Sequence, residues 1–155
     1  MEIIMKTLFY RCKGCGNFVL FVDEKTGCTP KCCGEPMEEL VANTADAAVE
    51  KHVPQVGVDG NVVKAQVGST IHPMLDAHYI QFICLETDKG IQIKYLKPGE
   101  EPKAEFAPAG GEKAIAVYEF WYLHGTSQPQ VPGASATVVI YPRSREQSRV
   151  QKLAF

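Results

Sequence analysis

Five of the six cysteines lie close together near the start of the chain, and their spacing is that of a metal site. Two residues separate Cys12 from Cys15, which lets the backbone curl around one ion. Cys32 and Cys33 are adjacent and are followed by Gly34, so both can reach one ion if the backbone bends there. Soft sulfur ligands in tetrahedral geometry select zinc or iron. Because structural zinc dominates four-cysteine sites, the spacing alone favours zinc, with iron as the alternative.

Two cysteines fall outside this pattern. Cys28 is a fifth candidate for four ligand positions, and its spacing does not exclude it. Cys84 stands alone in a strand-like segment. In a reducing compartment all six should be free thiols, so metal binding is a better interpretation of the cluster than disulfide formation.

The four histidines are candidates for a second metal site. Taken singly, each is more often a surface or core residue than a ligand. His72 and His78 flank a proline-containing loop that can turn two imidazoles toward one point, and His52 and His124 lie at predicted element ends. Histidine is the commonest metal ligand, but no short-range signature here requires one. The residues alone therefore indicate this second site only weakly.

Length and composition set the frame for these sites. The 155 residues suit one domain, or one domain with a small module. A net charge of −2 provides no basic surface for nucleic acid. No apolar run approaches the ~20 residues that span a bilayer, and no basic segment of a secretory signal precedes an apolar stretch. We therefore expect a soluble, cytoplasmic protein with no nucleic-acid or membrane partner.

The pattern along the chain predicts an all-β fold. Ten prolines and thirteen glycines indicate many turns and hence short strands. Residues 1–40 are typical of a compact module stapled by a metal, and the β-rich remainder favours an antiparallel sandwich. Segments rich in β-branched and aromatic residues predict strands near 5–10, 17–22, 61–67, 79–85, 91–96, 113–123 and 136–141.

In combination the motifs resemble a known family. Cys12-x-x-Cys15 with Cys32-Cys33-Gly34-Glu35-Pro36-Met37 is similar to the desulforedoxin-type iron module. The later motifs resemble the catalytic part of desulfoferrodoxin, the two-iron superoxide reductase, from about residue 8 to 125. They are Glu50-Lys51-His52-Val53-Pro54, His72-Pro73-Met74, His78-Tyr79-Ile80, Leu96-Lys97-Pro98-Gly99 and Leu123-His124-Gly125.

The resemblance implies an organisation for the chain up to residue 125 and says nothing about the residues that follow. It implies a rubredoxin-like module at 1–40 and an immunoglobulin-like β-sandwich at 41–125. Residues 126–155 are then an extension beyond the family pattern, to which we assign no role and which could add a strand. It also implies a homodimer, superoxide as the substrate and a rubredoxin-like electron donor. Two irons are implied, the first held by Cys12, Cys15, Cys32 and Cys33, the second by His52, His72, His78 and His124.

Two charged residues next to His52 acquire roles through the same resemblance. The family reduces superoxide by one electron to hydrogen peroxide. Lys51 is then the cation that attracts the anion and helps to deliver a proton through water. Glu50 is then the carboxylate that closes the open coordination position after oxidation.

One position departs from the family pattern. The family places an axial cysteine ligand three residues before the last histidine, and this chain has Trp121 there. Tryptophan cannot ligate iron. Cys84 cannot replace the missing thiolate without a sharp reversal, since it follows His78 by six residues of strand, about 20 Å. The missing donor should raise the potential of the second iron and slow the release of peroxide.

We therefore expect a non-haem iron oxidoreductase that resembles superoxide reductase and is impaired by Trp121. The alternative is a non-catalytic iron protein for electron transfer or redox sensing. A third interpretation is a structural zinc module that carries an inert sandwich.

Overall fold

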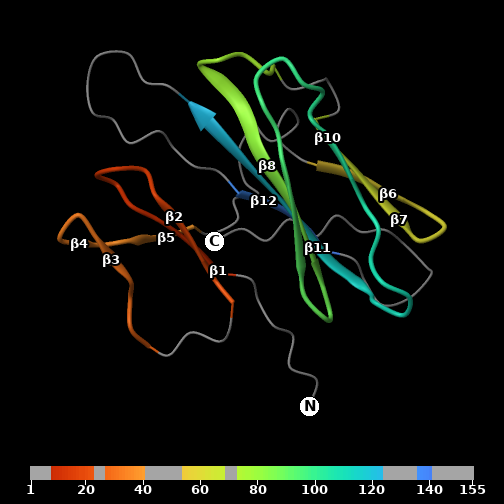
Figure 1. The fold of residues 1–155 in the computed structure, drawn as a ribbon, viewed down its shortest axis with the longest axis horizontal. Helices are drawn as coiled ribbons and strands as arrows, with labels where there is room; N and C mark the ends of the chain where they lie inside the picture. The colour runs from red at the N-terminus through yellow and green to blue at the C-terminus, as the bar shows by residue number, and fades with distance from the viewer. Residues whose placement is uncertain (1–7, 23–26, 41–53, 69–72, 124–135, 141–155) are drawn as a thin grey trace.

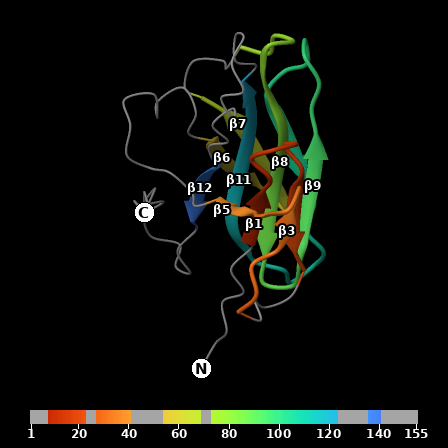
Figure 2. The ribbon, with the colours of Figure 1, turned by 90° about the vertical axis from the view of Figure 1, so that its left-hand side faces the viewer.

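A computed structural model describes residues 8–22, 27–40, 54–68, 73–123 and 136–140. Within these ranges every regular element is a β-strand, so the predicted all-β fold class is confirmed. The strands form three layers, which lie side by side in Figure 1. Figure 2 shows the molecule turned by 90°, with the cysteine-bearing layer toward the viewer. In the described ranges no helix could cross a membrane.

The first layer is the cysteine-bearing module. Its centre is β1 (Leu8–Arg11), which pairs antiparallel with β2 (Phe18–Phe21) on one side and with β5 (Glu38–Leu40) on the other. A separate small hairpin joins β3 (Lys31–Cys32) to β4 (Glu35–Pro36). Strands this short bury little apolar surface of their own, so the module depends on other contacts for its stability.

The other two layers form the sandwich. The outer sheet has the strand order β10 (Lys103–Phe106), β7 (Val62–Val67), β6 (Pro54–Asp59). The central sheet has the order β12 (Ala136–Ile140), β11 (Ala114–Leu123), β8 (His78–Thr87), β9 (Ile91–Tyr95). Residues Val63, Ala65 and Val67 alternate along one face of β7 and pack against Ile83 and Leu85 of β8.

The module covers the second face of the central sheet. Phe9 of β1 belongs to the same buried cluster as Cys84 of β8 and Tyr118 and Phe120 of β11. In Figure 1 the red and orange module accordingly lies on the opposite side of β8 and β11 from β6 and β7. The last five residues of β8 are all buried, because one face of this strand meets the outer sheet and the other meets the module.

Two pairs of strand ends meet at one end of the sandwich. β6 begins at Pro54, which is paired with Val67 at the end of β7. β8 begins at His78, which is paired with Leu123 at the end of β11. Met74, which lies between β7 and β8, packs against the buried cluster that contains Val67 at the end of β7 and Ile80 near the start of β8. We infer from this contact that all four strand ends lie at the same end of the sandwich.

The strand β12 lies within the stretch 126–155. It pairs antiparallel with β11 from Ala116 to Phe120, beside the ladder that joins β11 to β8. The β11–β8 ladder shifts register between Phe120 and Trp121, so that Trp121 is paired with Ile80. This irregularity falls next to the strand end that carries His78.

Candidate metal centre

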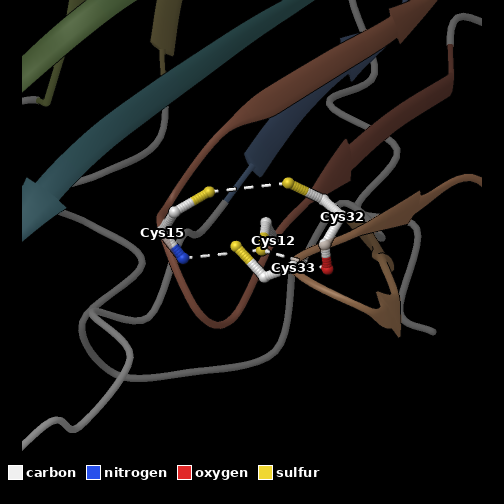
Figure 3. A group of neighbouring side chains, drawn as sticks. All are labelled: Cys12, Cys15, Cys32 and Cys33. Atoms are coloured by element: carbon white, nitrogen blue, oxygen red, sulfur yellow. Dashed lines mark hydrogen bonds between the residues drawn. The ribbon is translucent and has the colours of Figure 1, made fainter.

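The four cysteines predicted as ligands converge on one point. Their Sγ atoms all lie within 4.8 Å of one another, and those of Cys15 and Cys32 are 3.5 Å apart. Figure 3 shows the four side chains facing a common centre from two loops. A tetrahedral ion with bonds of about 2.3 Å places its sulfur ligands about 3.8 Å from one another. The group therefore has the size and donor set of a four-thiolate site for zinc or iron.

The first ligand pair comes from the loop that follows β1. The N–H of Gly16 donates to the carbonyl oxygen of Cys12 at 2.9 Å, and Gly16 has a φ of +78°. The N–H of Cys12 donates to the carbonyl oxygen of Asn17 at 2.9 Å, which closes the loop. Inside it, the N–H of Cys15 points to the Sγ of Cys12 at 3.5 Å. The backbone thus curls around the position of the ion and offers a donor to a sulfur atom.

The second pair comes from the hairpin between β3 and β4. Its two turn residues, Cys33 and Gly34, have φ values of +53° and +79°. Two successive residues with positive φ are the signature of a type I′ turn, which matches the twist of a tight hairpin. Among the described residues, Cys33 is the one non-glycine with a positive φ. That conformation costs about 1–2 kcal/mol, which a bond from Cys33 to an ion would offset.

Gly14 allows the two loops to approach each other. A Cβ atom at this position would lie 3.3 Å from the Cβ of Cys33 and 3.6 Å from its Sγ. It would also lie 3.7 Å from the Sγ of Cys12. A side chain at position 14 would therefore press on the Cβ of Cys33, whereas its distance from Cys12 is an ordinary van der Waals contact.

The electrostatics of the group favour a bound cation. The backbone N–H of Cys15 is the main reason that the pKa of Cys12 falls to about 6, so this thiol is ionised at neutral pH. In contrast, the neighbouring thiols of Cys15, Cys12 and Cys32 raise the pKa of Cys33 to about 12. The same crowding raises the pKa of Cys32. The thiol of Cys12 ionises readily, but the crowding of the group disfavours ionisation of Cys32 and Cys33. All four thiols can therefore ionise together only when a positive ion lies between them.

The four ligands differ in exposure. Cys12 is buried with Tyr10 and Met37 in a small apolar cluster. Cys15 and Cys33 are exposed at the outer edge of the module. An ion held here would be bound by the buried Cys12 on its inner side, and a partner could approach it from the exposed side of Cys15 and Cys33. Cys28 is exposed and is not part of the convergent group.

The predicted histidine site falls mostly outside the described residues. His78 is described: it is the half-buried first residue of β8, and burial lowers its pKa. A neutral imidazole is the form that binds metal. His52, His72 and His124 lie outside the described residues, as do Glu50 and Lys51.

Three residues around the cysteine group were not singled out from the sequence. Gly14 makes room between the loops, and the amide nitrogen of Asn17 lies 3.8 Å from the Sγ of Cys32. Arg11 is buried beside the first loop. Arg11 and Asn17 lie close to the Cys12–Cys15 motif in the sequence, and this proximity could have drawn attention to them. The orientation of their side chains, however, depends on how β1 and β2 pair.

Fold and site together define a class of protein in which a four-cysteine module is joined to an antiparallel β-sandwich. A comparison with known protein families identifies the family within this class. The family model for desulfoferrodoxin matches residues 44–128, and the chain belongs to the desulfoferrodoxin family.

Individual relatives cover most of the chain. A desulfoferrodoxin homolog of Archaeoglobus fulgidus is 46% identical over 119 residues, which is 77% of this chain and 93% of that protein. Desulfoferrodoxin of Nitratidesulfovibrio vulgaris is 42% identical over 116 residues, or 75% and 90% of the two chains. The crystal structure of the superoxide reductase from Treponema pallidum has a similar fold, with a TM-score of 0.65 and 36% identity. That likeness covers 79% of this chain and 96% of the other.

Proposed function

We propose that this protein is a non-haem iron oxidoreductase of the superoxide reductase type, which reduces superoxide by one electron to hydrogen peroxide. The observation that carries the proposal is the likeness to the Treponema pallidum superoxide reductase, which extends over nearly all of that chain. The convergence of Cys12, Cys15, Cys32 and Cys33 adds a thiolate site whose donor set suits iron. Zinc fits the same donors, so the identity of the ion is part of the proposal.

We propose three functional segments. Residues 1–40 form the metal module, residues 41–125 form the reductase sandwich, and residues 126–155 form an extension that contributes β12. The pairing of β1 with β5, which ends at Leu40, supports the first boundary. The family model begins at residue 44, which supports the same division.

A second iron is proposed at the end of the sandwich where four strand ends meet. His78 begins β8 there, His52 lies two residues before the start of β6, and His124 directly follows β11. His72 belongs to the connection between β7 and β8. This shared end of the sandwich supports a four-histidine site, because ligands at neighbouring strand ends can reach one ion. When bound, the iron would supply the electron that superoxide takes up.

Two charged side chains beside His52 are proposed to assist the reaction at the second iron. Lys51 precedes His52 and is proposed to attract the superoxide anion and to pass a proton to it through water. Glu50 is proposed as the carboxylate that approaches the open side of the site. A rubredoxin-like electron donor, a homodimer and a cytoplasmic location complete the proposal, and these rest on the family resemblance alone.

Trp121 is proposed to weaken the activity. It occupies the position of the family's axial cysteine and is paired with Ile80, two residues along β8 from His78. With four neutral imidazoles and no thiolate, the site would lack the electron donation that promotes release of the product peroxide. This same observation favours the second candidate function, a non-catalytic iron protein for electron transfer or redox sensing.

Metal analysis, visible spectra and pulse radiolysis of the purified protein test these proposals. A ferric four-thiolate centre absorbs strongly in the visible range, whereas zinc is silent. Iron at two sites per chain with measurable superoxide reduction supports the reductase, and iron without reduction supports the second candidate. Zinc alone contradicts both.

A substitution tests the assignment of the axial position. Trp121→Cys should add a visible thiolate-to-iron band from the second site and raise the rate of superoxide reduction. Tyr122→Cys, at the neighbouring position, is the matched control and should do neither. Equal rates in the wild type and Trp121→Cys would contradict the proposed impairment.

A further inference from the structure

Arg11 is a buried cation at the boundary between the module and the sandwich. It is the last residue of β1 and directly precedes the ligand Cys12. Only 5% of its surface is exposed. Arginine is rarely buried to this degree, and its charge persists at any pH that the protein tolerates. A fixed positive charge is therefore held inside the molecule beside the cysteine group.

Strand geometry directs Arg11 toward the central sheet. Alternate residues of a strand share a face, so Arg11 lies on the same side of β1 as Phe9. Phe9 packs against Phe82 and Phe120 of the central sheet. Tyr10 and Cys12 lie on the other side of β1, in their own apolar cluster.

Phe18 holds the guanidinium in place. It is the register partner of Arg11 on β2, and the guanidinium carbon lies 5.4 Å from the centre of its ring. The same ring makes edge contacts with Phe82 and Phe120, at 5.9 Å and 5.8 Å between centroids. The cation is therefore stacked on a ring that is itself fixed between the two units, and water is largely excluded from it.

The charge also lies against the loop that carries Cys12 and Cys15. A Cβ atom on Gly16 would lie 3.7 Å from an Nη atom of Arg11. Gly16 directly follows Cys15 and donates its N–H to the carbonyl oxygen of Cys12. A side chain at position 16 would thus meet the guanidinium, which lies next to the loop that wraps around the ion position.

We propose that Arg11 sets the reduction potential of the iron held by the four cysteines. Four thiolates with ferric iron carry a net charge of −1, and uptake of one electron from a donor, without a proton, makes this −2. A buried cation stabilises the more negative, reduced state and thereby raises the potential. Lys13 is a contrasting cation in the same loop: its side chain is exposed, so solvent screens its charge. Arg11 acts on the iron through its charge and is not one of the residues that coordinate it.

The experiment is a spectroelectrochemical titration of the visible ferric-thiolate absorption. It compares the full-length wild type with Arg11→Met, Arg11→Gln, Arg11→Lys and Lys13→Met. Both neutral variants at position 11 should raise the ratio of oxidised to reduced iron at least tenfold at a fixed potential. This equals a downward shift of about 59 mV for one electron. Arg11→Lys keeps the charge, and Lys13→Met removes an exposed one, so both should stay within about threefold of the wild type.

The outcomes separate this inference from the proposed function on which it rests. An unchanged potential in Arg11→Gln, with a normal ferric-thiolate spectrum, overturns the role of Arg11 alone. An equal shift in Arg11→Lys and Arg11→Gln assigns the effect to packing and also overturns it. A wild type that shows no ferric-thiolate spectrum overturns the iron assignment together with this inference. Thermal unfolding of the zinc-loaded variants shows which of them keep the fold.

Discussion

The ring of Phe9 in the cysteine module and the ring of Phe120 in the central sheet lie 4.5 Å apart between centroids, inclined at 57°. Phe120 in turn stacks on Phe82, its register partner on β8, at 4.4 Å. A residue three positions before Cys12 is therefore packed directly on the sandwich. The module and the sandwich share one apolar core and should unfold together.

Phe9→Ala should destabilise the zinc-loaded protein by about 3–5 kcal/mol, because it removes a buried ring from this shared core. Urea unfolding followed by far-UV circular dichroism measures the change. Val22→Ala is the matched control, since Val22 is 84% exposed and its truncation should stay within about 0.5 kcal/mol. A loss below about 1 kcal/mol for Phe9→Ala would show that the module does not pack on the sheet.

Cys28→Ser should leave the metal content and the thiolate spectrum unchanged, because Cys28 is exposed and outside the convergent group. Cys32→Ser should abolish or strongly weaken metal binding, because it removes one of four sulfur donors. Inductively coupled plasma mass spectrometry of both variants gives the metal content per chain. Loss of the metal from Cys28→Ser would contradict the ligand set.

Gly14→Ala should lower the affinity for zinc, because its new methyl group would meet the Cβ of Cys33 at 3.3 Å. Strain of about 1–3 kcal/mol corresponds to a loss of roughly five- to a hundredfold in affinity. Competition with a chromophoric chelator measures it. Gly110→Ala is the control, since nothing lies within 4 Å of the added atom, and its affinity should match the wild type.

The stability of the protein should fall above pH 9 through Cys84. Burial, with a smaller contribution from the charge of Glu86, raises the pKa of this thiol from 9.0 to about 12. Between these values the native state keeps a proton that the unfolded chain releases. The contribution of Cys84 is therefore complete below pH 9 and declines by about 1.4 kcal/mol per pH unit above it.

Urea unfolding of the zinc-loaded protein between pH 8 and pH 10.5 checks this pH dependence. Cys84→Ala should be less stable at pH 8 but should show a flatter decline, whereas Cys28→Ser should follow the wild type. A parallel decline in Cys84→Ala and the wild type would assign the pH dependence to other groups.

The sequence predicted the strands that are rich in β-branched and aromatic residues and missed those that are not. Segments predicted at 79–85 and 113–123 correspond to β8 and β11. Strand β6 contains Pro54 and Gly57, and β10 is short and charged, so neither resembles a strand in isolation. Both are edge strands of the outer sheet, where such residues are tolerated because one side of the strand needs no partner.

The cysteine site was predictable to a different degree from its surroundings. The spacing of Cys12 with Cys15 and of Cys32 with Cys33 predicted two pairs of ligands, but it left Cys28 as a fifth candidate. The family resemblance implied the four cysteines that converge in the structure. The buried position of Arg11 was not predictable, because it depends on the module packing against β8 and β11, which are distant in the sequence. The four-histidine site stays a prediction, because three of its residues lie outside the described ranges.

The pairing of β12 with β11 also bears on the behaviour of the protein at high concentration. Strand β11 is ten residues long and carries one charged residue, Glu119. If its outer edge were open, its unpaired N–H and C=O groups would offer a template for edge-to-edge association with other chains. Strand β12 occupies that edge from Ala116 to Phe120 and leaves a five-residue strand at the border of the sheet. Strand β12 thereby protects a long, apolar strand of the sandwich from self-association along this stretch.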